Sequence, residues 1–214
     1  MELKLNIPNS LNEITLGQYQ EFEKLDLTNE SKVHLKMIEI FCNVPEIVAR
    51  NIKATDVAEI CGIINNMFET KHQLINSFKL EGQEYSFIPS LQDMSFGEYI
   101  DLDTFIGDTE NLHRAMNVLY RPIELKQGKR YTLKEYDPES NEIAKDFPLD
   151  AVLGAIVFFY SLGKDLSLTM MNSLDKANQE TLAQHLISHP NTDGTTASLQ
   201  SLTEILQSLN ISLS

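Results

Sequence analysis

The chain has 214 residues, of which 42% are hydrophobic and 22% charged, proportions typical of a folded domain large enough for a core of its own. Its formal net charge of −14 disfavours binding to phosphate backbones and to anionic lipid, so we expect neither a nucleic-acid nor a membrane partner. The two cysteines form no CxxC motif, which favours a reducing compartment over a disulfide-stabilised protein.

The first predicted element is a strand at residues 2–7, where polar and apolar side chains alternate until the first proline. A helix start follows, because Thr15 and Gln18 have the spacing of a capping box. Tyr19 lies where a hydrophobic staple would pack on the apolar residue before the cap. Gly17 in the first turn costs about 1 kcal/mol relative to alanine, which predicts that another element crosses closely there.

The same helix start recurs eighty positions later in the chain. Residues 10–23 (SLNEITLGQYQEFE) and 90–103 (SLQDMSFGEYIDLD) align without a gap and are identical at four positions. The second occurrence repeats the cap, the glycine and the aromatic residue as Ser95, Gly97 and Tyr99, so the same staple and the same close crossing are expected there. Self-similarity of this kind indicates an internal repeat. We interpret the chain as two tandem copies of a strand–turn–three-helix unit.

The first copy is assigned to residues 1–76. Beyond its helix start, apolar residues at helical spacing predict a second helix over about 33–44, just before a proline. A third helix is predicted over about 55–68. Cys42 and Cys61 both lie on apolar helical faces, where a cysteine behaves as a small hydrophobic residue.

The second copy is assigned to residues 77–166 and contains the predicted hairpins. A strand at 77–80, a Glu-Gly turn and a strand at 84–88 indicate the first hairpin. An insertion near 123–146 distinguishes this copy from the first. It contains a glycine turn followed by a strand at 130–136, which indicates a second hairpin.

Two further helices are predicted in the second copy. Apolar residues from Leu112 to Tyr120 follow helical spacing, and Pro122 is expected to end that helix. Residues 148–162 (PLDAVLGAIVFFYSL) are apolar on nearly every side, so they are expected to form the buried centre of the domain. This segment is too short to span a bilayer, which needs about 20 apolar residues.

The C-terminal part is predicted to contain a helix at 167–187, a polar linker at 188–197 and an amphipathic helix at 198–214. One face of the last helix carries Leu199, Leu202, Ile205, Leu206 and Leu209. This stripe either docks into the groove of a partner or packs back on its own domain. The predicted fold class is therefore α+β and mainly α, with two tandem copies, one or two short β-hairpins and C-terminal helices.

The histidines give no clear metal or catalytic motif. His185 and His189 are four residues apart, which places them on one helix face, but no third ligand accompanies them and we interpret them as a solvated helix end. His113 and Arg114 are expected at the surface. The sequence also contains no phosphate-binding glycine loop and no HExxH or GxSxG motif.

The acidic residues Glu98, Asp101 and Asp103 are the remaining candidates for chemistry. Their counterparts in the first copy are Gln18, Glu21 and Glu23 at the same helix positions. An acidic, solvated first turn that favours the helix dipole explains both sets. We therefore expect no catalytic, cofactor or metal site, and we expect that the protein is not an enzyme.

Several segments resemble a group of acidic proteins encoded in the structural-gene clusters of tailed bacteriophages. These segments are SFGEYIDLD (95–103), NLHRAMNVLYRPI (111–123), RYTLKEYD (130–137) and FPLDAVLGAIVFFYSLGKDL (147–166). The predicted strand and TLGQYQEFEKL (15–25) also resemble the start of phage tail assembly chaperones. The resemblance implies that the chain binds a long tape-measure protein during tail assembly and keeps its apolar helices soluble.

Three functional hypotheses remain open from the sequence. The first is a tail assembly chaperone that acts in the host cytoplasm, which agrees with a start that lacks a signal peptide. The second is a permanent part of the virion, such as a minor capsid, connector or tail protein. The third, an enzyme, would require a pocket with converging titratable groups.

Overall fold

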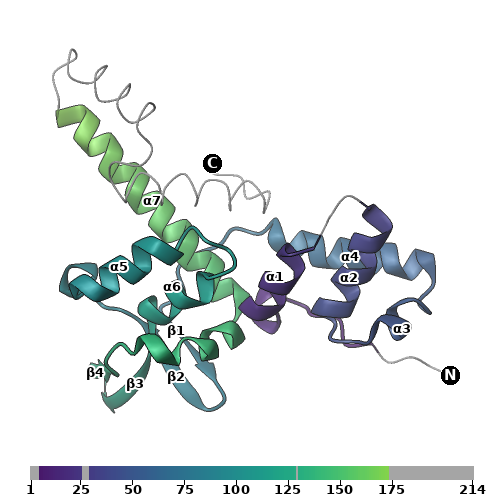
Figure 1. Cartoon of the computed structure of the whole chain (residues 1–214), viewed down its shortest axis with the longest axis horizontal. Helices are drawn as coiled ribbons and strands as arrows, with labels where there is room; N and C mark the ends of the chain where they lie inside the picture. The colour runs from purple at the N-terminus through teal and green to yellow at the C-terminus, as the bar shows by residue number, and fades with distance from the viewer. Residues whose placement is uncertain (1–4, 26–28, 129, 174–214) are drawn as a thin grey trace.

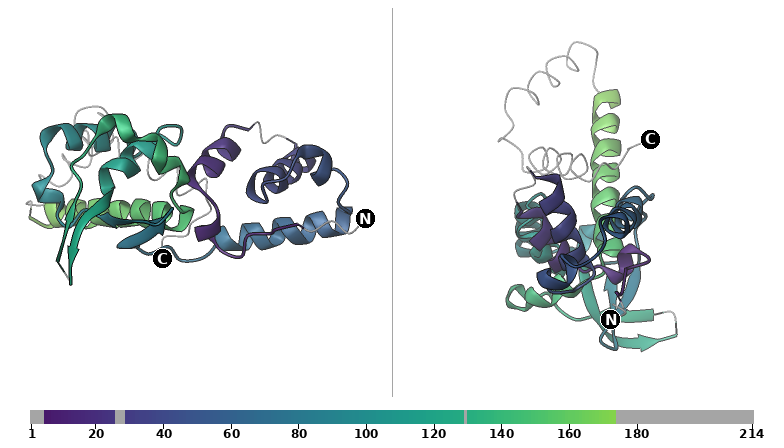
Figure 2. Two further views of the ribbon diagram at one scale, coloured as in Figure 1. Left: turned by 90° about the horizontal axis from the view of Figure 1, so that it is seen from below. Right: turned by 90° about the vertical axis from the view of Figure 1, so that its right-hand side faces the viewer.

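The computed structural model describes residues 5–25, 29–128 and 130–173, and in its last helix the side chains up to Lys164. It is an elongated α+β protein in which helices predominate (Figure 1), as the sequence predicts. A group of helices forms one end, and a four-stranded sheet with its covering helices forms the other. The left view of Figure 2 shows α4 (blue) and α7 (green) extending away from each other toward opposite ends.

The helical end begins with a single 3-10 turn, η1 (Leu11–Glu13), and then contains α1 (Leu16–Glu23), α2 (Glu30–Phe41), α3 (Glu46–Ala49) and α4 (Ala54–Phe68). The predicted helices at 33–44 and 55–68 correspond to α2 and α4, which pack against each other. Phe41 lies between Phe22 and Phe68, with ring centroids 5.1 and 6.1 Å away. These aromatic contacts join α1, α2 and α4 into one core.

The sheet contains β1 (Ser77–Leu80), β2 (Gln83–Phe87), β3 (Tyr120–Gln127) and β4 (Arg130–Leu133), antiparallel and in that order. Both predicted hairpins are confirmed. Glu81 and Gly82 have φ values of 49° and 85°, as the first turn requires at its two central positions. Gly128, with φ of 63°, is at the second turn.

The helix before β3 ends differently from the prediction. α6 (Leu112–Leu119) passes directly into β3 at Tyr120, and Pro122 lies inside that strand, opposite Tyr85. The helix therefore ends because the chain turns into the sheet, and the proline is not its stop signal. The predicted strand at 130–136 is also shorter, since β4 ends at Leu133.

The long helix α7 (Leu149–Ser173) is only partly the buried centre that the sequence predicts. Its first two turns are buried, from Leu149 to Ile156, but Leu162 is exposed. The predicted end near residue 162 is wrong, because the helix continues through Gly163 and projects from the body (Figure 1). Among the described residues, no helix is long and apolar enough to cross a membrane.

The start of α7 joins the two ends of the molecule. The 3-10 helix η4 (Glu142–Asp146) leads into it, and Thr15 and Pro148 form an isolated antiparallel bridge. The Leu16 N–H donates to the Phe147 carbonyl at 2.9 Å. In return, the Leu149 N–H donates to the Ile14 carbonyl at 2.9 Å. The segment 147–149 therefore covers the N-terminal end of α1.

The predicted N-terminal strand is not seen where the chain is described, because residues 5–8 have no strand assignment. The two helix starts do share their local structure, since a 3-10 helix, η2 (Leu91–Asp93), also precedes α5 (Phe96–Phe105). Beyond them, three helices follow α1, whereas α6 and a hairpin follow α5. Tandem duplication of the whole unit stays a prediction.

Candidate functional site

The candidate site is built on α5, whose start has the predicted capping box. The Ser95 N–H donates to Glu98 Oε2 at 2.6 Å, and the Glu98 N–H donates to Ser95 Oγ at 3.3 Å. The same reciprocal pair starts α1, where the Thr15 N–H donates to Gln18 Oε1 at 2.9 Å and Thr15 Oγ1 accepts at 3.2 Å. Both predicted capping boxes are therefore confirmed.

The inner face of α5 is held by a buried ion pair between Glu98 and Arg121 of β3, whose side chains are 9% and 15% exposed. The interpretation of Glu98 as part of a solvated acidic turn is therefore wrong. Burial alone would raise the pKa of Glu98, but the Ser95 bonds and the Arg121 guanidinium outweigh it and lower that pKa. The sequence could not show that Arg121, twenty-three residues away, reaches this carboxylate.

A second polar link lies one turn further along the same face. The Tyr136 hydroxyl donates to Asp101 Oδ2 at 2.7 Å, and burial followed by this carboxylate raises the Tyr136 pKa. The Arg121 guanidinium lies 5.9 Å from the Tyr136 ring centroid, close enough for a cation–π contact. The Glu98–Arg121 and Asp101–Tyr136 pairs thus tie α5 to β3 and to the segment after β4.

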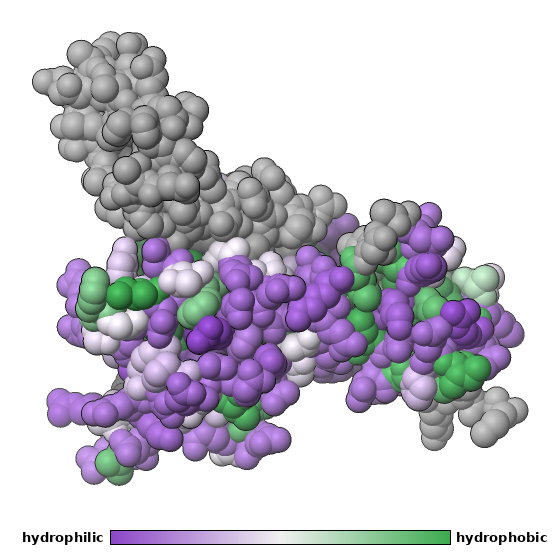
Figure 3. Space-filling model, in the orientation of Figure 1, coloured by the Kyte–Doolittle hydropathy of each residue, from purple (hydrophilic) through white to green (hydrophobic). Residues whose placement is uncertain are grey.

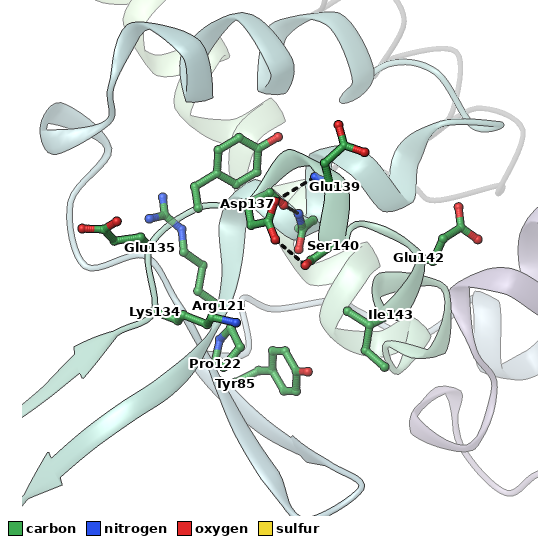
Figure 4. A pocket seen from close by; sticks show the side chains of 12 residues that line it. Tyr85, Arg121, Pro122, Lys134, Glu135, Asp137, Glu139, Ser140, Glu142 and Ile143 are labelled. Carbon is green, nitrogen blue, oxygen red and sulfur yellow. Dashed lines mark hydrogen bonds between the residues drawn. The ribbon is translucent and has the colours of Figure 1, made fainter.

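A pocket of about 350 Å³ opens beside this network, between β3 and residues 134–143 (Figure 4). Asp137 at its rim caps the 3-10 helix η3 (Pro138–Ser140), accepting from the Glu139 N–H at 3.0 Å and from Ser140 Oγ at 2.6 Å. These bonds lower the Asp137 pKa. The polar groups named here hold the segment after β4 in place, so their role is structural.

The outer face of α5 has the opposite character. Phe96 is 78% exposed, Tyr99 47% and Ile100 45%, and their spacing of three and four residues places them together on one side of the helix. Apolar residues are visible over α5 among mostly hydrophilic surroundings (Figure 3). A cluster of exposed apolar residues of this kind is a candidate interaction site. We call Phe96, Tyr99 and Ile100 the α5 apolar face.

The corresponding face of α1 is covered. Leu16 and Tyr19, which match Phe96 and Tyr99 in the repeated segment, are 0% and 1% exposed. A Cβ on Gly17 would lie 3.2 Å from the Lys145 carbonyl oxygen, so the predicted close approach is confirmed there. At Gly97 the prediction is wrong, because nothing lies within 4 Å of the equivalent position. Tyr99, the predicted staple residue of the second copy, is 47% exposed.

The remaining predicted residues lie apart from this face. His113, expected at the surface, is buried at 6% exposure. α6 turns it toward Gln20 of α1, and His113 Nδ1 lies 3.2 Å from Gln20 Nε2. Cys42 and Cys61 are buried, and burial raises the pKa of the Cys42 thiol to about 11. His185, His189 and the apolar stripe of the last predicted helix, Leu199 to Leu209, lie outside the described residues.

The part of the chain that is described contains no group of three His, Cys, Asp or Glu side chains able to hold a metal ion. Comparison with known protein families, curated proteins and solved structures found no match to this chain. The α5 apolar face is therefore the candidate functional site. The sequence contained its signal, Phe96 and Ile100 four residues apart, but not which side of α5 faces the rest of the protein.

Proposed function

We propose that this chain is a non-enzymatic phage protein that acts by protein–protein interaction. Its most specific role is that of a tail assembly chaperone, which binds the tape-measure protein in the host cytoplasm. The observation that carries this proposal is the α5 apolar face, which the body presents to solvent while it buries the matching face of α1. The phage assignment itself rests on the sequence resemblance.

The chemistry of the surface supports a holding role. A long helical partner must keep its apolar faces away from other copies of itself until it assembles, and an exposed apolar helix face offers them a temporary contact. The net charge of −14 keeps such a complex soluble through mutual repulsion. The polar links from α5 to β3 and to the segment after β4 hold the α5 apolar face rigid, which lowers the entropy cost of binding.

Co-expression with the tape-measure protein that this proposal implies as the partner tests it. We expect the wild-type chain to raise the soluble fraction of that protein and to co-purify with it. The double substitution Phe96→Asp and Ile100→Asp should abolish both effects, since it places charge on the α5 apolar face. Ile47→Asp is the matched control, because Ile47 is 67% exposed but lies on α3. Equal loss in both variants would contradict the proposal.

The alternative, a permanent virion component such as a minor capsid, connector or tail protein, predicts a different fate for the chain. Mass spectrometry of purified particles distinguishes the two roles. A chaperone should be absent from mature particles, whereas a structural component should be present in a fixed ratio to the other virion proteins.

A further inference from the structure

We propose that the α5 apolar face binds, at its Phe96 end, an extended apolar–proline–apolar segment at the start of a partner helix, in the way that residues 147–149 bond to the start of α1. The identity of this partner as another protein rests on the proposed function. The mode of binding rests on the structure, because the chain contains the contact once already. The contact at the start of α1 therefore indicates the kind of segment that the exposed start of α5 can bind.

The covered contact on α1 has two parts. The first is the pair of backbone hydrogen bonds between the residues flanking Thr15 and those flanking Pro148, both 2.9 Å long. Pro148 lies at the centre of this bridge, where its missing N–H is not needed. The second part is the burial of the residues on either side of the proline: Phe147 and Leu149 are both 0% exposed, and the Phe147 ring packs on the Phe78 and Tyr85 rings of the sheet.

The glycine of the motif makes the close approach possible. Lys145 brings its backbone oxygen and its Cβ to 3.2 and 3.3 Å from the position that a Gly17 side chain would occupy. A side chain at position 17 would require Lys145, in the 3-10 helix η4, to shift by a few tenths of an ångström. The cap, the glycine and the apolar residue between them therefore lie where residues 145–149 approach the start of α1.

The start of α5 has a cap, an apolar residue and a glycine at the same positions as the start of α1. Ser95 caps the helix, Gly97 has open space beside it, and Phe96 lies between them with 78% of its surface exposed. The Leu16 N–H bonds to Phe147, but within the described ranges no backbone carbonyl accepts from the Phe96 N–H. A donor and an apolar surface of the right spacing are thus both present for a partner.

The residues that differ between the starts of α1 and α5 indicate the chemistry of that partner. Gln20 on α1 donates to the Thr109 and Glu110 carbonyls at 2.8 and 2.9 Å, whereas Ile100 holds the matching position on α5. The partner should therefore place apolar side chains there. Asp93, just before the α5 cap, is exposed, so a basic residue near the segment, as Lys145 is near Phe147, would suit the acidic flank.

A second copy of this chain is a less suitable occupant. Its own residues 147–149 are already buried against α1, so a copy would have to open that contact before it could donate them. A separate protein that carries a free segment of this kind meets no such cost. The proposal therefore commits to a segment of another protein.

Fluorescence anisotropy with a labelled peptide tests this binding mode directly. The probe is a fluorescein-labelled peptide with the sequence of residues 143–152 (IAKDFPLDAV), added to the full-length chain. We expect saturable binding that Phe96→Asp with Ile100→Asp weakens about tenfold or more, while Ile47→Asp leaves it unchanged. A peptide with serine in place of its phenylalanine and leucine should not bind. Absence of wild-type binding up to about 1 mM would overturn the proposal.

Amide hydrogen exchange measured by NMR supplies a readout that only this geometry moves. Saturating peptide should slow exchange of the Phe96 N–H, and the Leu16 N–H serves as the internal reference for a bonded amide. Peptide binding without protection of Phe96 would overturn the bridge, as would a concentration-dependent dimer abolished by the Asp substitutions. If the peptide fails while the tape-measure protein is still solubilised, the binding mode is wrong but the proposed function stands.

Discussion

Single glycines inside helices show how closely elements approach in this fold. Gly154 in the buried part of α7 faces the backbone of residues 73–74, and a Cβ there would lie 2.9 Å from the Gln73 carbonyl carbon and nearer still to its oxygen. Gly62 in α4 has nothing within 4 Å of the same position. The first glycine is required by the packing of the chain, and the second is not.

Gly154→Ala should therefore lower the free energy of unfolding by about 2 kcal/mol or more, because the backbone at Gln73 would have to move. Gly62→Ala, in contrast, should raise it by up to about 1 kcal/mol, the gain in helix propensity. Urea denaturation followed by circular dichroism measures both variants against the wild type. A Gly154→Ala protein as stable as the wild type would show that residues 73–74 yield easily.

The α5 helix depends on polar links that cross to other elements. Glu98 reaches Arg121 on β3, and Asp101 accepts from Tyr136 beyond β4. A buried ion pair is costly to break from one side, since the remaining charge is left without its partner. In contrast, Glu84 and Lys126 form a pair across β2 and β3 with side chains 27% and 50% exposed, where such a pair contributes little.

Glu98→Gln is expected to lower stability at pH 7 by about 3 kcal/mol, whereas Glu84→Gln should cost less than about 1 kcal/mol. The Glu98 pKa lies below its ordinary value of 4.5 in the folded chain. Its contribution is therefore present above pH 4.5 and is lost as the pH falls through the lowered pKa. Urea midpoints measured from pH 7 to pH 3 should show the gap between wild type and Glu98→Gln closing. A gap independent of pH would contradict this account.

Local signals in the sequence predicted the elements whose causes are local. The capping residues Thr15 and Ser95 and the turn at Gly82 depend on neighbours within four positions, and these predictions were confirmed. Predictions that depended on which side of a helix meets another element were less successful. Gly97 and His113 belong to helices that were correctly expected, but the burial of each is set by residues far along the chain.

The same limit applied to the candidate site. The apolar spacing of Phe96, Tyr99 and Ile100 is readable in the sequence, yet a stripe of this kind is usually buried. In the structure Glu98, paired with Arg121, and Leu102 are buried, so the side of α5 that carries Phe96, Tyr99 and Ile100 faces outward. The orientation of the helix thus depends on contacts with residues far along the chain.

The whole molecule is stabilised by a core that begins near its N-terminus. Buried apolar residues of the described part lie between Leu11 and Ile156, and the bridge at Thr15 and Pro148 connects the two ends of this span. The helical end and the sheet are therefore joined through the start of α7. The predicted C-terminal helix at 198–214 follows far beyond these contacts in sequence.

Deletion of residues 196–214 should accordingly leave the fold intact, with a melting temperature within about 2 °C of the full chain. If the stripe from Leu199 to Leu209 contributes to binding, the truncated chain should also co-purify less of the tape-measure protein. Differential scanning calorimetry and the co-expression assay measure the two effects separately. A fall of several degrees would mean that this helix packs on its own domain.

The passage from α6 into β3 has no connecting residue, since the helix ends at Leu119 and the strand begins at Tyr120. The Tyr120 hydroxyl bonds to the Ile75 carbonyl at 2.8 Å and to the Ala151 carbonyl at 3.2 Å, which fixes the side of the sheet that this residue faces. A single residue inserted at the junction would rotate every following side chain to the opposite surface, carrying Arg121 away from Glu98. We therefore expect extra residues to be tolerated at the hairpin tips but not at this junction.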